Sequence, residues 1–241
     1  MPSQAWLISG ANRGIGYELV KIVADLGHVV FAGVRNPSKA TTLKTLASSN
    51  SNIHILQLES TSVSDSIAAA KVVEGVSGGL DVVVANAGIA SNWQKVAELD
   101  LESLYEHYKV NAAGPVVLFQ AVYPLLLKRQ TRKFVTVSTL AASIANLLPV
   151  PDTVYGSSKA ALNFITRSIH KEHFDEGFIV FPIHPGMVDT EMGQSAAPVF
   201  GVTKLSMSPA ESAEAVFHVV DTSTKEQSGR FLSYDGTDLP W

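Results

Sequence analysis

Seven short apolar or β-branched runs recur along the chain, with amphipathic stretches of helical length between them. They cover residues 6–9, 29–34, 53–58, 82–86, 134–138, 179–184 and 230–233. This alternation is typical of βαβ units, which build a parallel sheet. The unbroken apolar run at 82–84 indicates a strand covered by helices on both faces. We therefore predict an α/β fold with a doubly wound parallel sheet of the Rossmann type.

The chain is the right size for one large core. It has 241 residues, of which 46% are hydrophobic and 17% charged, and no linker, repeat or low-complexity tract divides it. We expect a single domain over 1–241. The segment 191–209 breaks the alternation late in the chain, and we expect a mobile lid over a substrate there.

Charge and cysteine content exclude several classes of function. The formal net charge is −4 and no basic run is present, which argues against a nucleic-acid partner. The chain has no cysteine, so disulfides, thiolate catalysis and cysteine-ligated metals are excluded. Residues 1–10 lack a signal-peptide pattern. The apolar stretch 112–127 contains Gly114, Gln120 and Pro124 and is too short to span a bilayer. We expect a cytoplasmic protein without membrane contact and with no metal site.

A glycine-rich segment follows the first predicted strand and opens an amphipathic run. Glycines at such a junction let backbone amides approach a pyrophosphate at a helix N-terminus. The spacing is Gly-x-x-x-Gly-x-Gly, and the candidate dinucleotide-binding residues are Gly10, Asn12, Arg13, Gly14, Ile15 and Gly16.

Charges near this turn favour NADP(H) over NAD(H). NAD enzymes usually place an acidic residue about 20 positions after the glycines, whereas a nearby arginine suits the 2′-phosphate of NADP. Nothing acidic occurs from Leu26 to Leu58, while Arg35 closes the second predicted strand and Arg13 lies inside the turn. We expect both guanidinium groups to contact the 2′-phosphate.

Tyr155 and Lys159 are four residues apart, so on a helix they share one face. A phenol with an ordinary pKa near ~10 is a poor proton carrier at neutral pH. We expect the adjacent ammonium to lower the pKa of Tyr155 toward the working range. Tyr155 would then protonate a ketone oxygen as hydride arrives at carbon.

These motifs, in this order, resemble the short-chain dehydrogenase/reductase family. The glycine turn is followed by Asn86-Ala87-Gly88, Asn111, the pair Tyr155 and Lys159, and Pro185-Gly186. The resemblance covers essentially the whole chain. Residues 184–193 and 235–241 further resemble the C-factor/sniffer group, near fungal norsolorinic acid ketoreductase-like enzymes.

The resemblance implies roles for the remaining site residues. Asn111 would bend its helix and carry a water chain toward Lys159, which itself would also hold the nicotinamide ribose. Other matching positions would contact adenine and ribose or hold the nicotinamide carboxamide. The former are Glu59, Ser60, Asn86, Ala87 and Gly88; the latter are Pro185, Gly186, Val188 and Thr190. Relatives commonly carry Asp where Glu59 stands, which leaves its adenine contact open.

The hydroxyl that polarises the carbonyl is expected after the fifth strand, where relatives have a Ser-Ser pair with the second residue catalytic. This chain has Ser138-Thr139 there. By register Thr139 takes the catalytic position and Ser138 a supporting one, although a register shift by one would reverse these roles.

The expected function is NADPH-dependent reduction of a hydrophobic, aromatic or polyketide-type carbonyl compound in secondary metabolism. One alternative is an imine or hydroxysteroid oxidoreductase on the same fold. Another is a signalling or sensor protein that binds NADP(H) without turnover. The family resemblance also implies a homodimer or homotetramer formed through the helices that hold Asn111 and Tyr155.

Overall fold

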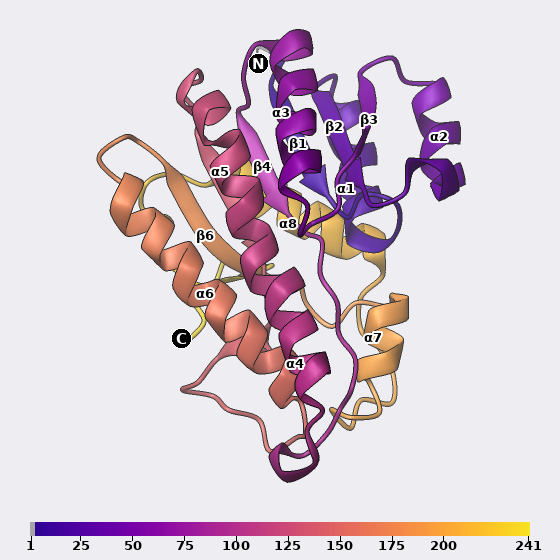
Figure 1. Cartoon of the computed structure of the whole chain (residues 1–241), viewed down its shortest axis with the longest axis vertical. Helices are drawn as coiled ribbons and strands as arrows, with labels where there is room; N and C mark the ends of the chain where they lie inside the picture. The colour runs from indigo at the N-terminus through magenta and orange to yellow at the C-terminus, as the bar shows by residue number, and fades with distance from the viewer. Residues whose placement is uncertain (1–2) are drawn as a thin grey trace.

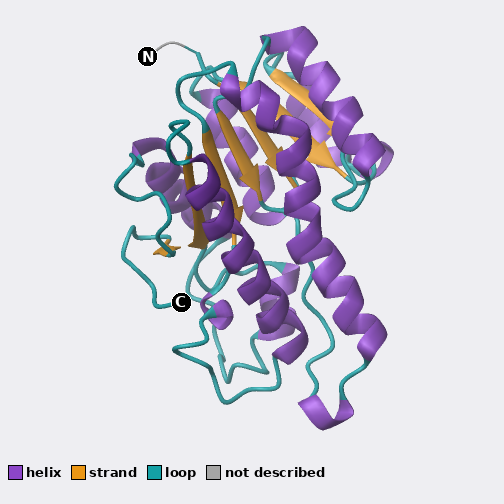
Figure 2. Ribbon diagram, turned by 60° about the vertical axis from the view of Figure 1, so that its left-hand side comes forward, coloured by secondary structure: helices purple, strands orange, loops and turns teal. Residues whose placement is uncertain are grey.

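The computed structural model describes residues 3–241 and shows one sheet between two layers of helices (Figures 1 and 2). All seven strands are parallel, in the order β3-β2-β1-β4-β5-β6-β7. This confirms the predicted doubly wound α/β fold. The strands are β1 (Ala5–Ser9), β2 (Val29–Val34), β3 (Ile53–Gln57), β4 (Val82–Ala85), β5 (Lys133–Val137), β6 (Ile179–His184) and β7 (Leu232–Ser233).

Within residues 3–241, eight α-helices connect and cover the strands. They are α1 (Gly14–Asp25), α2 (Thr41–Ser48), α3 (Val63–Ser77), α4 (Leu101–His107), α5 (Gly114–Leu127), α6 (Thr153–His173), α7 (Glu191–Ala196) and α8 (Pro209–Thr222). Short 3-10 turns lie at Pro37–Lys39, Val96–Glu98 and Leu140–Ala142.

The core is split into two parts by the sheet. Successive strand side chains point to opposite faces, so Trp6 and Ile8 pack with α1 and α8, whereas Leu7 packs on the other face with α3 and α5. Both faces of β1 and β4 are fully buried. The continuous apolar runs in the sequence follow from this double cover.

Helices α4 and α5 form one long rod, joined by a π-helical segment at Tyr108–Ala113. By length and composition the whole helix Leu101–Leu127 is sufficient to cross a membrane, but half of its most apolar window is buried inside this fold. The stretch 112–127 is thus a packed helix, as the sequence predicts. Figure 1 shows the rod extending past the carboxyl ends of the strands, where α6 and α7 also lie.

The strand order reverses between β1 and β4, which lie side by side at the centre of the sheet. Connections from these two strands leave toward opposite sides, so a crevice opens at their carboxyl ends. This is the point at which open α/β sheets bind their ligands. The glycine turn follows β1 there, and residues 86–88 follow β4.

Candidate active site

The glycine turn is closely packed against the segment after β4. Gly10 has φ +67°, a conformation that side chains disfavour. A Cβ at Gly16 would lie 2.5 Å from the Gly10 carbonyl oxygen and 2.6 Å from Asn86 Nδ2. The first turn of α1 can therefore approach the strand ends only because residue 16 is glycine. The turn leaves the start of α1 open to an anion, which is what a pyrophosphate site requires.

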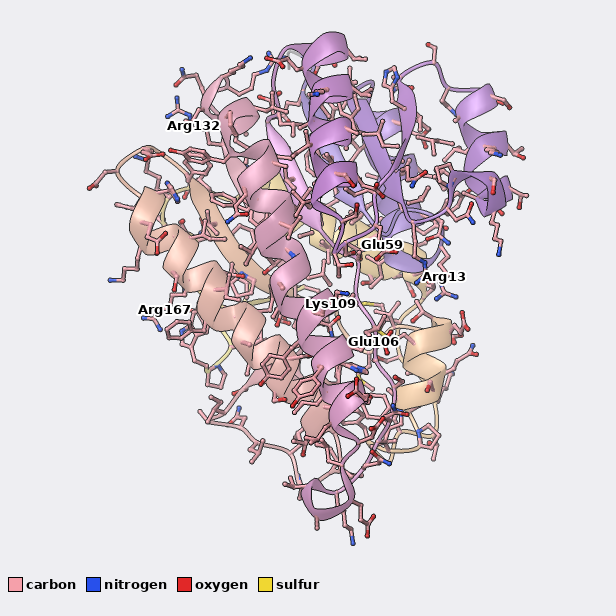
Figure 3. The ribbon with its side chains drawn as sticks, in the orientation of Figure 1. Arg13, Glu59, Glu106, Lys109, Arg132 and Arg167 are labelled. Carbon is pink, nitrogen blue, oxygen red and sulfur yellow. The ribbon has the colours of Figure 1, made fainter. Side chains whose placement is uncertain are left out.

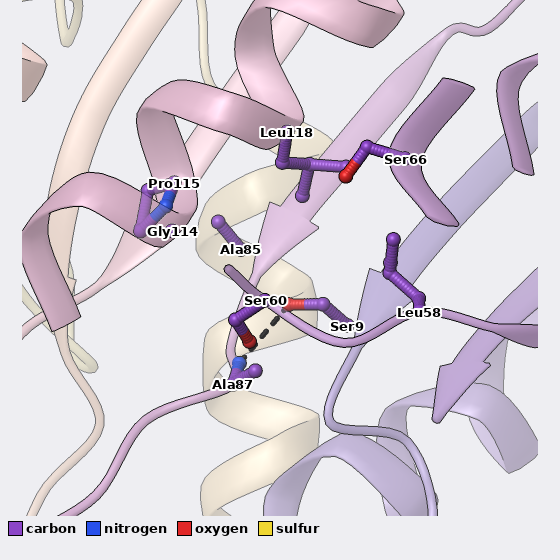
Figure 4. Close-up of a pocket in the computed structure, with 9 residues that line it drawn as sticks. All are labelled: Ser9, Leu58, Ser60, Ser66, Ala85, Ala87, Gly114, Pro115 and Leu118. Atoms are coloured by element: carbon purple, nitrogen blue, oxygen red, sulfur yellow. Dashed lines mark hydrogen bonds between the residues drawn. The ribbon is translucent and has the colours of Figure 1, made fainter. Parts of the chain in front are cut away.

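Asn86 and Ser9 tie the turn to the end of β4. The Ser9 hydroxyl accepts the backbone N–H groups of Asn86 and Ala87, each at 3.0 Å, and Figure 4 shows the bond to Ala87. Asn86 Nδ2 donates to the Ser9 carbonyl oxygen at 2.9 Å. A small cavity beside the glycine turn is lined in part by Ser9, Ser60 and Ala87. Asn86 is thus occupied in shaping the turn.

Each of the two arginines predicted to meet the 2′-phosphate faces a carboxylate. Arg35 Nε lies 3.8 Å from Glu59 Oε2, and Arg13 forms an ion pair with Glu191 in the first turn of α7. Both arginine side chains are exposed, at 81% for Arg35 and 71% for Arg13. Figure 3 shows Arg13 and Glu59 near the carboxyl edge of the sheet. Glu59 is therefore directed toward Arg35.

Tyr155 stands near the start of α6, opposite the loop that follows β5. Burial raises the pKa of its phenol to about 12, a hydrogen bond with the Thr139 side chain opposes that shift, and the charge of Asp152 adds to it. The expected lowering of this pKa by Lys159 is therefore wrong. The phenol remains protonated at neutral pH, which is the form that can donate a proton.

Lys159 is 4% exposed and its ammonium donates to the Val137 carbonyl oxygen at 2.8 Å. Burial lowers its pKa to about 8. The ammonium is thus directed to the end of β5, and spacing along α6 alone does not reveal this. A Cβ at Gly88 would lie 3.2 Å from Lys159 Nζ and 3.1 Å from Asn111 Oδ1. The segment after β4 thus meets both residues.

Asn111 is fully buried within the π-helical segment. Its side-chain oxygen accepts the Ile89 N–H at 2.9 Å, and its Nδ2 donates to the Ile89 carbonyl oxygen at 2.9 Å and to Ser158 Oγ at 3.0 Å. The asparagine therefore links α6 to the loop after β4. These hydrogen bonds explain why an asparagine lies in the interior of a helix, because an apolar residue at position 111 could not form them.

Ser138 and Thr139 differ in what their hydroxyls contact. Ser138 is 2% exposed and donates to Asn163 Oδ1 at 2.6 Å, inside the contact between β5 and α6. Thr139 is partly exposed and its hydroxyl reaches both Tyr155 and the Ala141 N–H, the latter at 3.3 Å. Of the two hydroxyls, that of Thr139 is the one beside the phenol.

The loop after β6 lies against the glycine turn. A Cβ at Gly14 would lie 3.3 Å from Thr190 Cγ2. The Thr190 hydroxyl accepts the Gly193 N–H at 3.1 Å and so caps α7, and Val188 is buried. Ser212 in α8 donates to the Pro185 carbonyl oxygen at 2.7 Å. This loop is consequently fixed at both ends, next to the start of α1.

Three further side chains line the site: Phe200 lies in the predicted lid and His184 in the motif 184–193, whereas nothing in the sequence pointed to Trp93. Trp93 packs edge-on against Tyr155 and against Phe200, with ring centroids 5.9 Å apart in each case. His184 accepts the Leu140 N–H at 3.2 Å through Nδ1, because burial lowers its pKa to about 4 and keeps the ring neutral. These residues come from loops or from a strand end, where no periodicity marks them.

The short chain dehydrogenase family model matches residues 4–198 of this chain. The chain belongs to the short-chain dehydrogenase family. An oxidoreductase of Schizosaccharomyces pombe is 38% identical to this short-chain dehydrogenase, over 99% of this chain and 98% of that protein. The short chain dehydrogenase gsfK of Penicillium aethiopicum is 37% identical, over 98% of each chain.

Two solved structures are close to this short-chain dehydrogenase over nearly all of its length. The NADPH-bound carbonyl reductase from chicken fatty liver has a TM-score of 0.90 and 31% identity, covering 100% of both chains. The carbonyl reductase Sniffer of Drosophila melanogaster has a TM-score of 0.92 and 29% identity, covering 99% of this chain and 100% of that one. The sniffer-like resemblance in the sequence is confirmed.

Proposed function

We propose that this oxidoreductase reduces the carbonyl group of a hydrophobic, aromatic small molecule with NADPH. The observation that carries the proposal is the hydrogen bond between the Tyr155 phenol and the Thr139 hydroxyl, one helical turn from the buried Lys159. Polyketide-type aromatic ketones fall within this class. The loss of NADPH absorbance during incubation with a panel of aromatic ketones and quinones tests it. NADPH binding without absorbance loss on any of them would favour a sensor instead.

The residues present fit an NADP(H) molecule. The close approach of Gly10 and Gly16 forms a cradle that a Cβ would fill, and the amides of Gly14, Ile15 and Gly16 begin α1 beside it. Arg35, with Arg13, would hold the 2′-phosphate, and the neighbouring segments 59–60, 86–88 and 185–190 would flank the rest. The nicotinamide, when bound, supplies the hydride.

Each polar residue around the carbonyl then has a distinct task. Tyr155 donates its phenolic proton to the carbonyl oxygen, and Thr139 donates a hydrogen bond to the same oxygen. Lys159, whose ammonium is held at the end of β5 by the Val137 carbonyl oxygen, would bind the nicotinamide ribose. Asn111 holds the Ile89 loop and α6 together, so that Lys159 and Gly88 keep their relative positions.

Segment 191–209 acts as a lid in this proposal. Its first six residues form α7, which is held to the phosphate turn by the ion pair of Glu191 with Arg13. Phe200, beyond α7, contacts Trp93. Both ion-pair side chains are more than 70% exposed. Such surface pairs contribute only about 0–1 kcal/mol, so the 2′-phosphate can displace Glu191 from Arg13 without a large penalty.

Replacing Arg35 with alanine should weaken NADPH binding by about ten to a hundred times and leave NADH affinity nearly unchanged. A charge-assisted contact with a phosphate contributes roughly 1.5–3 kcal/mol, and only NADPH carries that phosphate. Fluorescence titration with both cofactors measures the two affinities. Glu59→Gln is the matched control, because it removes the carboxylate 3.8 Å from Arg35 and should leave NADPH binding equal or tighter. Equal loss for both cofactors in Arg35→Ala would contradict the assignment.

Carbonyl reduction should slow as the pH rises through about 8. Lys159 has its pKa lowered to about 8, so it is charged below that pH and loses its charge above it. The phenol, with a pKa of about 12, stays protonated across the same range. The measurement is kcat/KM for one accepted ketone against pH. In Lys159→Arg the charge persists, so a fall through pH 8 that remained in this variant would point to another group.

We propose that the chain forms a homodimer or homotetramer through α4 and α6. Leu101 and Tyr105 of α4 and Tyr108 of the π-helical segment are exposed at helical spacing, and Phe164 on the neighbouring α6 is 76% exposed. Exposed apolar side chains of this kind are typical of subunit contacts. In a two-fold symmetric dimer, the same surface would be buried on both subunits.

Replacing Phe164 with glutamate should convert the oligomer to a monomer, because it places a charge where an apolar ring would be buried. Light scattering coupled to size exclusion gives the mass directly. Val76→Glu, on the exposed face of α3, is the matched control and should not change the mass. A wild-type chain that is monomeric at every concentration would refute this assembly.

A further inference from the structure

The indole N–H of Trp93 is a buried donor at the edge of the catalytic centre. Its Nε1 is inaccessible and has no acceptor among residues 3–241. The indole of Trp6, by contrast, donates to Gln4 Oε1 at 2.9 Å. Most buried donors in proteins are satisfied, and an unsatisfied donor is costly. A donor left without a partner beside Tyr155 therefore requires an explanation.

The loop that carries Trp93 is held in place by two anchors on α4. The Ser91 N–H donates to His107 Nε2 at 3.1 Å, and His107 Nδ1 is in turn bonded to the Ser103 carbonyl oxygen at 2.8 Å. Asn92 Nδ2 donates to Ser103 Oγ at 2.6 Å. Ser91 and Asn92, the two residues before Trp93, are thus both bonded to α4, and these bonds fix the position of the indole.

Asn92 adds a second sign that the position is selected. It has φ +57°, a left-handed conformation that residues with a side chain seldom adopt, asparagine being among the more frequent of them. Such conformations persist only where the surrounding structure enforces them, and they cluster at ligand-binding sites. Here Asn92 lies immediately before Trp93, whose ring centroid is 5.9 Å from that of Tyr155.

We propose that, when the 191–209 lid moves Phe200 off the indole, the Trp93 N–H donates a hydrogen bond to a second acceptor atom of the substrate, distinct from the carbonyl oxygen at Tyr155. This rests on the proposed carbonyl reduction and narrows its substrate class. The preferred substrates are flat aromatic ketones or quinones that carry another oxygen or a ring nitrogen. A ketone without a second acceptor leaves the indole N–H unpaired and is therefore disfavoured, since a site built around a hydrogen bond discriminates against analogues that lack it.

The kinetic test compares acetophenone with the three isomeric acetylpyridines, which differ from it only by a nitrogen acceptor at one ring position. Trp93→Phe keeps an aromatic ring and deletes the N–H. The ratio of wild-type to variant kcat/KM, taken for each substrate, removes the intrinsic reactivity of each ketone. We expect this ratio to be about tenfold larger for at least one acetylpyridine than for acetophenone, as the loss of one neutral hydrogen bond implies.

Phe200→Leu is the control for packing. It removes the other ring that packs against Trp93 but leaves the indole N–H. The ratio of wild-type to Phe200→Leu kcat/KM should therefore be similar for acetophenone and the three acetylpyridines. Four equal ratios in Trp93→Phe would overturn the proposal and leave Trp93 as a packing residue only.

A second measurement does not depend on turnover. The chain has three tryptophans, so a ¹⁵N-labelled sample gives at most three indole cross-peaks, and the peak lost in Trp93→Phe belongs to Trp93. In the complex with NADP⁺, an acetylpyridine should shift the Trp93 indole proton downfield, whereas acetophenone should not. An unshifted peak with all four compounds refutes the hydrogen bond. A shifted peak without reduction of any ketone would refute the proposed reaction and support the binding role.

Discussion

Tyr155→Phe should lower ketone reduction by about 10² to 10⁴, the usual contribution of a positioned proton donor. The substitution removes the phenolic hydroxyl and almost no volume, so the ring contact with Trp93 persists. Because the pKa of the phenol is raised to about 12, the wild-type residue is protonated throughout the neutral range and is ready to act as the acid. Stopped-flow or steady-state loss of NADPH absorbance measures the effect.

Cofactor affinity separates this prediction from a general loss of structure. Tyr155 is not among the residues proposed to hold the 2′-phosphate or the pyrophosphate, so the NADPH dissociation constant should change little in Tyr155→Phe. A variant that turns over at the wild-type rate would remove Tyr155 from the mechanism. A variant that no longer binds NADPH would show that its role lies in holding the site together.

Thr139→Ala should lower turnover by about 10² to 10³, as expected for a donor directed at developing negative charge. Ser138→Ala should have a far smaller effect, because the Ser138 hydroxyl is occupied by Asn163 at 2.6 Å beneath the site. Thr139→Ser keeps the hydroxyl and should retain much of the activity. Steady-state kinetics with one accepted ketone gives the turnover of the three variants and thus ranks their activities.

The opposite order of the two alanine variants would shift the register of the catalytic hydroxyl by one residue. The stability of Ser138→Ala provides a check. Its loss of a buried hydrogen bond should lower the free energy of unfolding by about 1–3 kcal/mol, whereas Thr139→Ala, at a partly exposed position, should lower it less. Activity and stability are thus expected to rank these variants in opposite directions.

The fold was predictable because a doubly covered sheet leaves a strong trace in the sequence. Runs such as 82–84 are apolar at every position since both faces of β4 are buried. The prediction was weakest at the sheet edge, where the run 230–233 contributes only Leu232 and Ser233 to β7. Gly229 has φ +80° and turns the chain just before this point, so pairing with β6 begins late.

The candidate site was predictable where its residues follow strands, because the carboxyl ends of parallel strands meet at one edge. Trp93 and Phe200 lie in loops, and their contact depends on the tertiary path rather than on any local pattern. The sequence also does not show the direction in which a side chain points. The four-residue spacing places Lys159 on the face of Tyr155 but does not show that its ammonium points to Val137. Nor does the spacing show that the phenol is buried, and burial is what raises its pKa against the expected effect of Lys159.

The π-helical segment at Tyr108–Ala113 has a consequence for how changes in length are tolerated. An α-helix turns by about 100° per residue, and the wider π-turn accommodates one extra residue while it keeps the two α-helical halves nearly in phase. The α4 half directs Ser103 and His107 to the Trp93 loop, while the α5 half directs Leu118 and Val122 into the core. If 108–113 became a regular helix of unchanged length, the two halves would be about 100° out of phase, and packing of α5 against the sheet would rotate α4 away from the loop that it anchors. Deleting one residue at the same time would keep the halves nearly in phase, because it removes the residue that the wide turn accommodates.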